Sequence, residues 1–266
     1  MSSPAAGSPA SGNPASGNLA PISVEPLLRG RFGRPYLYLE RCETTQRMLD
    51  AGFPEGAVAV CEKQTGGRGR LGRSWEAPLG SSILVSVLLR PPPSRRAAEL
   101  TLVTGLATAV AIEKATGLAA QVKWPNDVVL DGRKVSGGIA ELRDGTVVVG
   151  IGINVNQTSA ELPVGTKLPA GSLLLATGRE HDRPHLLADL LLELERLYED
   201  WRASGIEAIA AAIGERDYLR GREVTVDGAQ GVATGIASDG RLEVATPTGP
   251  VFVESGEVSL GASAPE

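Results

Sequence analysis

Short apolar runs rich in β-branched residues recur through the first part of the chain. They cover residues 57–62, 83–89, 121–123, 128–130 and 146–156. Their length and composition are typical of β-strands, and the last run alternates with the period of two that a strand face requires. Asp131 and Gly132 follow the fourth run and predict a hairpin turn. The pattern indicates a mixed sheet, with glycines on several strands that leave room beside the backbone.

Longer segments with helical periodicity lie between and after these runs. Residues 97–116 carry apolar side chains around much of their circumference, which predicts a helix buried against a sheet. Residues 184–201 are amphipathic, and residues 206–216 form a further helical piece. We expect both to cover the back of the sheet. A short helix through Met48 and Leu49 is expected to be N-capped by Thr44 or Thr45.

The pattern changes at Gly221 to short β-runs separated by the turn signals Asp227-Gly228 and Asp239-Gly240. This is typical of a small closed β-module, which we expect to be SH3-like. The predicted fold class is therefore α+β: a central mixed β-sheet with helices packed on it, plus a small C-terminal SH3-like β-barrel. We place the main domain at residues 31–217 and the SH3-like domain at residues 218–266.

The first twenty residues are mainly Ser, Ala, Gly, Pro and Asn and carry no charged side chain. Such a segment buries too little apolar surface to order itself, so we expect a disordered tail over residues 1–30. The segment lacks the basic start and apolar centre of a secretory signal. No apolar run reaches the length of a membrane span. We expect a cytoplasmic protein without a membrane partner.

Composition and charge exclude several function classes. A formal net charge of −5 and a pI near 5.3 argue against a general nucleic-acid-binding surface. Cys42 and Cys61 provide no disulfide framework, and His181 and His185 have no cysteine or histidine beside them. We therefore predict no transition-metal site.

The local charge of residues 66–73 opposes the charge of the whole chain. The run reads Gly-Gly-Arg-Gly-Arg-Leu-Gly-Arg, and its arginines offer forked donors that suit phosphate or carboxylate oxygens. Its glycines allow close backbone approach to a ligand. It is not a Walker A loop, because no Gly-Lys-Ser or Gly-Lys-Thr closes it. A solvated surface loop or an RNA-binding segment is the alternative, but strands on both sides argue against disorder.

A second group of candidate residues lies at residues 123–127, Lys-Trp-Pro-Asn-Asp, between two predicted strands. Proline and the Asx residues favour a sharp turn that presents a lysine and a carboxylate together. Trp124 is equally well explained as core filling. Lys134 precedes two further glycines, Gly137 and Gly138, and Asn154 and Asn156 share one side of a strand.

In these motifs the chain resembles the biotin protein ligases over about residues 36–262. The motifs that carry the resemblance are Gly67-Arg68-Gly69-Arg70-x-Gly72-Arg73 followed by Trp75, Lys123-Trp124-Pro125-Asn126-Asp127, Arg133-Lys134-x-x-Gly137, and Gly150-x-Gly152-x-Asn154. Four motifs in one order are far more specific than any one of them. The resemblance implies that residues 31–217 bind biotin and ATP, form biotinyl-5′-AMP and pyrophosphate, and pass biotin to a lysine of a carrier domain.

The resemblance also implies roles for individual residues. It places Lys134, Arg70, Lys123 and Asp127 in catalysis. It places Thr44, Thr45, Gln64, Gly67, Arg68, Lys134 and Gly137 at biotin, with Trp75 or Trp124 as apolar walls. Arg68, Arg70, Arg73, Trp75, Lys123, Asn126, Lys134 and Asn154 are expected at ATP or the adenylate. Mg²⁺ is the expected cofactor, with Asp127 as its candidate ligand, and roles among Lys123, Asn126 and Asp127 stay open.

The expected protein partner is the biotin carboxyl carrier domain of acyl-CoA carboxylases. No nucleic-acid partner is expected. Some members of the family carry an N-terminal DNA-binding domain, and we expect a monofunctional type without one. The usual Ser-Thr-Asn of the family is Thr44-Thr45-Gln46 here, so hydrogen bonding at Gln46 differs. The alternatives are a lipoate or other acyl-group ligase of the same superfamily and, in another class, a nucleic-acid-binding module.

Overall fold

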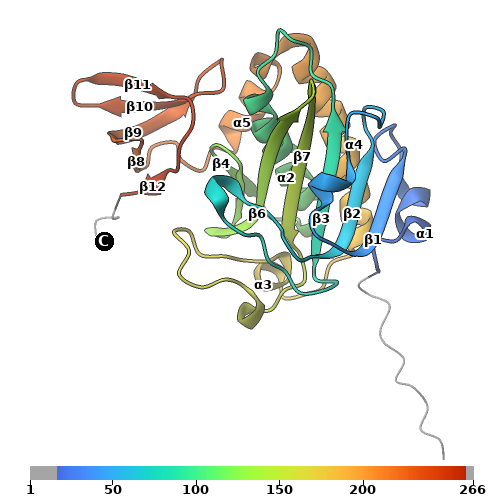
Figure 1. The fold of residues 1–266 in the computed structure, drawn as a ribbon. Coiled ribbons are helices and arrows are strands. Elements are labelled where there is room, and N and C mark those ends of the chain that lie inside the picture. The colour runs from blue at the N-terminus through green and yellow to red at the C-terminus, as the bar shows by residue number, and fades with distance from the viewer. Residues whose placement is uncertain (1–16, 262–266) are drawn as a thin grey trace, which may run out of the picture.

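A seven-stranded sheet forms the centre of the molecule, in a computed structural model that describes residues 17–261 (Figure 1). Its strands are β1 Tyr36–Cys42, β2 Val58–Gln64, β3 Ser82–Leu89, β4 Ala120–Lys123, β5 Asp127–Leu130, β6 Arg133–Arg143 and β7 Thr146–Asn154. They are ordered β1-β2-β3-β7-β6-β5-β4. β1 and β2 are parallel and the other neighbours antiparallel, so the predicted mixed sheet is confirmed.

Helices cover one face of this sheet. α2 (Leu100–Thr116) follows the 3₁₀ turn η4 (Ala97–Glu99), and α4 (Arg183–Ser204) packs beside it behind the strands (Figure 1). α2 is buried over most of its surface and ends at Gly117, whose φ of 76° a side chain would disfavour. α4 begins where Asp182 accepts a hydrogen bond from the backbone of His185. Shorter pieces are α3 Leu173–Thr177, α5 Ala210–Glu215, η2 Thr45–Met48, η3 Arg70–Gly72, η5 Ser159–Glu161 and η6 Ile206–Ala208.

The C-terminal module is an antiparallel sheet of five strands beside β4 (Figure 1). Its strands are β8 Glu223–Val226, β9 Ala229–Ile236, β10 Leu242–Thr246, β11 Gly249–Val253 and β12 Ser259–Leu260. The order β11-β10-β9-β8-β12 leaves β11 and β12 as edges among the residues described, so the expected barrel is not closed. Closure would need β12 to reach β11, and a strand of two residues pairs only with β8.

Residues 17–30 correct the expectation of a disordered tail up to residue 30. They include α1 (Pro21–Val24) and η1 (Glu25–Leu27), and Leu19, Val24 and Leu28 are buried in the main core. Tyr36 donates a hydrogen bond to the carbonyl of Leu19 over 2.7 Å, which fixes the segment beside β1. The physical reason is that three well-placed apolar residues suffice for docking when a finished sheet supplies the surface. The remainder of the expected tail, residues 1–16, lies outside the described residues.

No helix within residues 17–261 combines the length and apolar character needed to cross a bilayer.

Candidate active site

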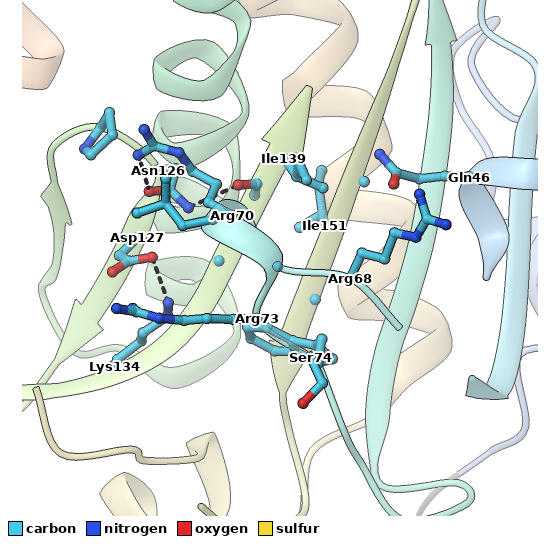
Figure 2. A pocket seen from close by; sticks show the side chains of 18 of the residues that line it. Gln46, Arg68, Arg70, Arg73, Ser74, Asn126, Asp127, Lys134, Ile139 and Ile151 are labelled. Carbon is cyan, nitrogen blue, oxygen red and sulfur yellow. Dashed lines mark hydrogen bonds and ion pairs between the residues drawn. The ribbon is translucent and has the colours of Figure 1, made fainter. Parts of the chain in front are cut away.

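A cavity lies on the face of the sheet that the helices leave open. Its floor crosses β2, β3, β7 and β6, and the loop of residues 66–75 covers it (Figures 1 and 2). Most of the residues predicted from the sequence line it: Thr44, Thr45, Gln64, Arg68, Arg70, Arg73, Trp75, Lys123, Asn126, Asp127, Lys134 and Gly137. Gly67 lies under the backbone of Trp75 instead, where a Cβ would come within 2.3 Å of the Trp75 carbonyl oxygen.

Glycines on the central strands make room for Trp75. A Cβ at Gly152 would fall 2.4 Å from the indole Cε2, and one at Gly137 would fall 3.1 Å from Cζ3. These contacts set the indole flat against β6 and β7, so any larger residue at Gly137 or Gly152 would displace the indole. Trp124 is different: it is 1% exposed and donates its indole N–H to the carbonyl of Gly240 over 3.0 Å. Trp75 is therefore the apolar wall and Trp124 belongs to the core.

Polar side chains gather at the end of the cavity formed by β2 and η2. Gln64 Oε1 accepts a hydrogen bond from the backbone of Thr45 over 2.8 Å, and Thr45 Oγ1 lies 2.8 Å from Ser86 Oγ. Thr44 is the N-cap residue of η2, as predicted, but its side chain makes no capping hydrogen bond within the described chain. The Thr45 hydroxyl joins a buried network across β2 and β3, which leaves the end of the cavity rich in hydrogen-bonding groups.

Positive charge gathers at the opposite end of the cavity. Lys134 Nζ on β6 lies 2.6 Å from Asp127 Oδ1 on β5, and Figure 2 shows the pair facing the cavity. Lys123 is 8% exposed, and its Nζ lies 3.4 Å from the carbonyl oxygen of Val258. Burial lowers the pKa of Lys123, with neighbouring Asp127 opposing the shift. Two lysines beside one carboxylate leave an excess of positive charge, which suits an anionic ligand.

Asn126 connects the arginine loop to the sheet. Its Oδ1 accepts a hydrogen bond from Arg70 Nη1 over 3.1 Å, and its Nδ2 donates to the carbonyl of Gly138 over 2.8 Å (Figure 2). Burial lowers the pKa of the Arg70 guanidinium, while nearby Asp127 raises it. The amide of Asn126 therefore holds Arg70 over the cavity, a positioning role that the sequence did not separate from ligand contact.

The loop itself is a tight hairpin. A backbone bridge joins Arg68 to Ser74, and the backbone of Trp75 donates to the carbonyl of Gly67 over 2.9 Å. Leu71 and Gly72 at its tip have φ of 57° and 74°, the left-handed conformation that glycine tolerates and leucine disfavours. The hairpin aims Arg68, Arg70 and Arg73 at different parts of the cavity, as Figure 2 shows.

Glu257 of the C-terminal module joins two loops above the charged end. It pairs with Arg73 of the arginine loop and with Lys167 Nζ over 3.0 Å. These hydrogen bonds lower the pKa of the Glu257 carboxyl, with Arg73 as the larger cause. Neither Glu257 nor Lys167 was predicted from the sequence, because the two residues lie far from every motif and meet only in the folded chain.

A second cavity adjoins the first and shares with it Lys134, Asp127, Lys123, Trp75, Arg73, Ser74, Glu257 and Val258. Its other walls are Glu76, Asn154, Pro163, Thr166, Lys167, Leu168, Ala170 and Leu260. Asn154 Nδ2 donates to the carbonyl of Gly171 over 2.9 Å. The backbone N–H of Lys134 donates to the carbonyl of Pro169, and its carbonyl accepts from the N–H of Gly171, each over 2.8 Å. Both partners belong to the loop that follows β7. Asn154 is therefore linked to the backbone of Lys134 through Gly171.

Comparisons with known proteins agree with this geometry. The biotin/lipoate A/B protein ligase family matches residues 38–157, and the biotin protein ligase C terminal domain matches residues 220–261. The bifunctional ligase/repressor BirA of Bacillus spizizenii is 35% identical over 245 residues, 86% of this chain and 75% of that protein. The biotin–[acetyl-CoA-carboxylase] ligase of Mycobacterium tuberculosis is 36% identical over 219 residues, 77% of this chain and 79% of that protein.

Solved structures give the same result. The biotin protein ligase from Aquifex aeolicus, in complex with biotin and ATP, superposes with a TM-score of 0.78 at 33% identity. The match covers 85% of this chain and 98% of that one. Sequence, fold and the position of the motif residues around one cavity thus lead to one assignment: the chain belongs to the biotin protein ligase family.

Proposed function

We propose that this chain activates biotin with ATP, giving biotinyl-5′-AMP and pyrophosphate, and transfers the biotinyl group to a lysine of a biotin carboxyl carrier domain. The observation that carries the proposal is the polarity of the cavity: hydrogen-bonding groups at Thr45 and Gln64 lie at one end, and Lys134 and Asp127 lie at the other. A ligand with a polar ring and a distant carboxylate matches this distribution.

Biotin fits the cavity in one direction. The floor runs from β2 through β3 and β7 to β6, three strand spacings or roughly 14 Å. The ureido ring, with both donors and acceptors, binds among Thr44, Thr45 and Gln64. The valeryl chain passes beside the indole of Trp75, which itself covers the glycines of β6 and β7, and its carboxylate ends at Lys134. Arg68 extends over the same cavity and faces the valeryl chain of biotin from the loop side.

The second cavity takes the nucleotide. It opens from the charged end, and Lys167 and Arg73 line it together with apolar Leu168. A triphosphate placed there lies against positive side chains, with its α-phosphate beside Lys134. Asn154, held by Gly171, lies in the same wall and contributes to the nucleotide pocket.

Two chemical steps follow from this placement. A carboxylate oxygen of biotin attacks the α-phosphorus, and pyrophosphate leaves with the bonding electrons. Lys134, Lys123 and Arg70 stabilise the negative charge that gathers on the phosphoryl oxygens. The carrier lysine, as a free amine, then attacks the acyl carbon, and AMP leaves. Lys134 serves both steps because it lies where carboxyl and phosphoryl oxygens meet, and Asp127 keeps its ammonium aligned.

Asp127 is the proposed protein ligand for Mg²⁺. Magnesium commonly takes one or two carboxylates and completes its shell with phosphate oxygens and water. Within residues 17–261 no group of three or more His, Cys, Asp or Glu side chains gathers, so a single carboxylate with phosphates is the arrangement that fits. When bound, the ion neutralises phosphate charge. Asp127 already pairs with Lys134, so a bound ion would use the carboxylate that this lysine contacts.

The acceptor proposed is the carrier domain of an acyl-CoA carboxylase. The test is transfer: the purified chain is mixed with biotin, ATP, Mg²⁺ and an isolated carrier domain, and the carrier mass is measured. We expect one biotinyl group added at one lysine. A carrier whose mass stays unchanged, with the chain folded and the adenylate formed, would contradict the proposed acceptor.

Arg70→Gly should make the chain release its reactive intermediate. Arg70 lies over the cavity and is held by Asn126, so its loss opens the cover above the mixed anhydride. We expect adenylate formation to continue and added bulk proteins to become biotinylated at random lysines. Streptavidin blots of a lysate, with Arg47→Gly as an exposed-arginine control, measure the effect; equal selectivity in both variants contradicts it.

Glu257→Gln should weaken nucleotide binding about three-fold. The carboxylate pairs with Arg73 and Lys167, both more than half exposed, and such exposed pairs each contribute roughly 0.2–1 kcal/mol. Because the folded-state pKa of Glu257 is lowered, this contribution is present above the carboxyl's ordinary pKa and is lost as the pH falls through the lowered value. The KM for ATP is measured for the variant and for the control Glu243→Gln on β10, which lines neither cavity; identical values would refute the contact.

A further inference from the structure

The two cysteines of the chain meet on neighbouring strands. Cys42 is the last residue of β1, Cys61 lies within β2, and their Sγ atoms are 3.0 Å apart. Both are free thiols, and Cys61 is 0% exposed whereas Cys42 is half-buried. A disulfide holds its sulfurs about 2.05 Å apart, so an approach of about 1 Å is enough to bond them. The sequence contains no other cysteine, so any disulfide within one chain joins these two.

The two strands differ in their freedom to move. Cys61 is held on both sides, because it pairs with Leu39 of β1 and with Leu84 of β3. β1 is an edge of the seven-stranded sheet and pairs with β2 alone within residues 17–261 (Figure 1). Cys42 ends this edge strand, where backbone opens most easily. The approach of the two sulfurs must therefore come mainly from Cys42 and the backbone that follows it.

The backbone around Cys42 supports one end of the first cavity. Its carbonyl accepts a hydrogen bond from the N–H of Thr65 over 2.9 Å, immediately before the arginine loop begins. Three residues after Cys42, the N–H of Thr45 donates to Gln64 Oε1 over 2.8 Å. Hydrogen bonds of this kind span about 2.7–3.2 Å, so a displacement of about 1 Å breaks or distorts them. A disulfide at Cys42 thus disturbs the polar end of the cavity and the base of the loop together.

We propose that Cys42 and Cys61 are a redox modification site, which a low-molecular-weight disulfide oxidises to an internal disulfide that weakens the binding of biotin. The effect on biotin rests on the proposed function, since it requires the ureido ring to bind among the groups around Thr45 and Gln64. The reduced chain is the form that binds biotin well, and reduction of the disulfide restores it.

The oxidation proceeds by two thiol–disulfide exchanges. The Cys42 thiolate attacks one sulfur of the small disulfide and forms a mixed disulfide, while the other sulfur leaves as a thiolate. The Cys61 sulfur then attacks the Cys42 sulfur, forms the internal disulfide and expels the second small thiolate. The protons of the two cysteines pass to the two released thiols. The protein loses two electrons and two protons, and the small disulfide gains them.

The order of attack follows from the surroundings of the two thiols. The hydrogen bond with Cys61 lowers the pKa of the Cys42 thiol, although burial opposes this shift. The same hydrogen bond, together with burial, raises the pKa of the Cys61 thiol. The half-buried Cys42 is therefore the thiolate that meets an incoming disulfide. Cys61 is enclosed and reacts only with the mixed disulfide that forms beside it.

The first experiment measures formation of the disulfide. The folded full chain is equilibrated with oxidised glutathione, its remaining thiols are blocked with iodoacetamide in denaturant, and the intact mass is measured. We expect a monomer that has lost two hydrogen atoms and carries no blocked cysteine. A chain that keeps two blockable thiols, or that stops at a glutathionyl adduct, would overturn the proposal.

Single variants test the assigned roles. Cys61→Ala should accumulate one glutathionyl group at Cys42, because the resolving thiol is gone. Cys42→Ser should accumulate none, because Cys61 is enclosed. Circular dichroism verifies that both variants are folded. The reverse pattern of adducts in folded variants would contradict the order of attack.

Calorimetry with biotin measures the consequence for binding. The oxidised chain should bind biotin about ten-fold more weakly than the reduced chain, as expected when hydrogen bonds at buried groups are lost. Dithiothreitol should restore the original Kd. Cys42→Ser, treated with the same oxidised glutathione, is the matched control and should keep the Kd of the reduced chain. An internal disulfide that leaves the Kd for biotin unchanged would overturn the regulatory role.

The two readouts separate this inference from the proposed function. Mass detects the disulfide whether or not the chain binds biotin. If the reduced chain neither binds biotin nor exchanges pyrophosphate, the proposed function fails, and the effect on biotin fails with it. If the reduced chain does both and the oxidised chain matches it, only the regulation through Cys42 and Cys61 is wrong.

Discussion

Lys134→Ala is expected to abolish most biotin activation while leaving the fold intact. Lys134 lies where the two cavities meet, 2.6 Å from Asp127 and within 5.8 Å of the centre of the Trp75 ring. Its charge faces the oxygens that become more negative in the transition state. Removing one such fixed donor typically lowers turnover by 10²–10³-fold, and we expect a loss on that order.

Steady-state kinetics of adenylate formation measure this loss, and the KM values separate it from weaker binding. The loss should fall chiefly on kcat, because the charge is needed most in the transition state. Lys114→Ala, at an exposed lysine that pairs with Asp189 on α4, is the matched control and should keep full activity. Turnover within three-fold of the unaltered chain in Lys134→Ala would remove Lys134 from the reaction.

Arg183→Ala is expected to destabilise the fold by about 3–5 kcal/mol, because it leaves a buried carboxylate unpaired. Arg183 Nη1 lies 2.6 Å from Glu62 Oε2, with side chains 2% and 5% exposed. The same guanidinium donates to the carbonyls of Ser82 and Gly17 over 3.0 and 3.1 Å. It therefore joins α4, β2, β3 and the N-terminal segment at one buried point.

Urea unfolding measures this cost through the change in midpoint at constant slope. Arg31→Ala, in a half-exposed pair with Glu195, is the comparison and should cost no more than about 1 kcal/mol. The double variant Arg183→Met with Glu62→Leu should recover part of the loss, since it leaves no unpaired charge. A cost below 1 kcal/mol for Arg183→Ala would mean that Glu62 finds another partner.

Five of the seven strands of the central sheet were predicted from apolar runs, whereas β1 and β6 were not, because most of their side chains are half-buried or exposed. β3 and β7 are buried along their whole length, and both were predicted within two residues of their ends. The N-terminal segment was misjudged, because residues 17–30 were grouped with the small and polar residues before them, although Leu19, Val24 and Leu28 are apolar and buried. Whether such a segment is buried depends on the surface that other strands provide. The composition of the segment alone carries no information about that surface.

The candidate site was predicted as a set of residues, but not as an arrangement. Arg70 and Asn126 were both named, yet their hydrogen bond links positions 56 residues apart and needs the finished sheet. Glu257 and Lys167 were missed, because a carboxylate in a β-module and a loop lysine show no motif. Gln46 was noticed only as a departure from a familiar pattern. Its burial, and the absence of a hydrogen-bond partner for its Nε2 within residues 17–261, follow only from the folded chain.

The central claim is that the chain activates biotin with ATP where the two cavities meet, and exchange of labelled pyrophosphate into ATP tests it most directly. The assay is run with Mg²⁺ and with biotin, lipoate or no acid added. We predict exchange with biotin alone, because the groups around Thr45 and Gln64 suit a ureido ring and the charged end suits a carboxylate. Exchange driven by lipoate, or none with either acid from a folded chain, would contradict the account.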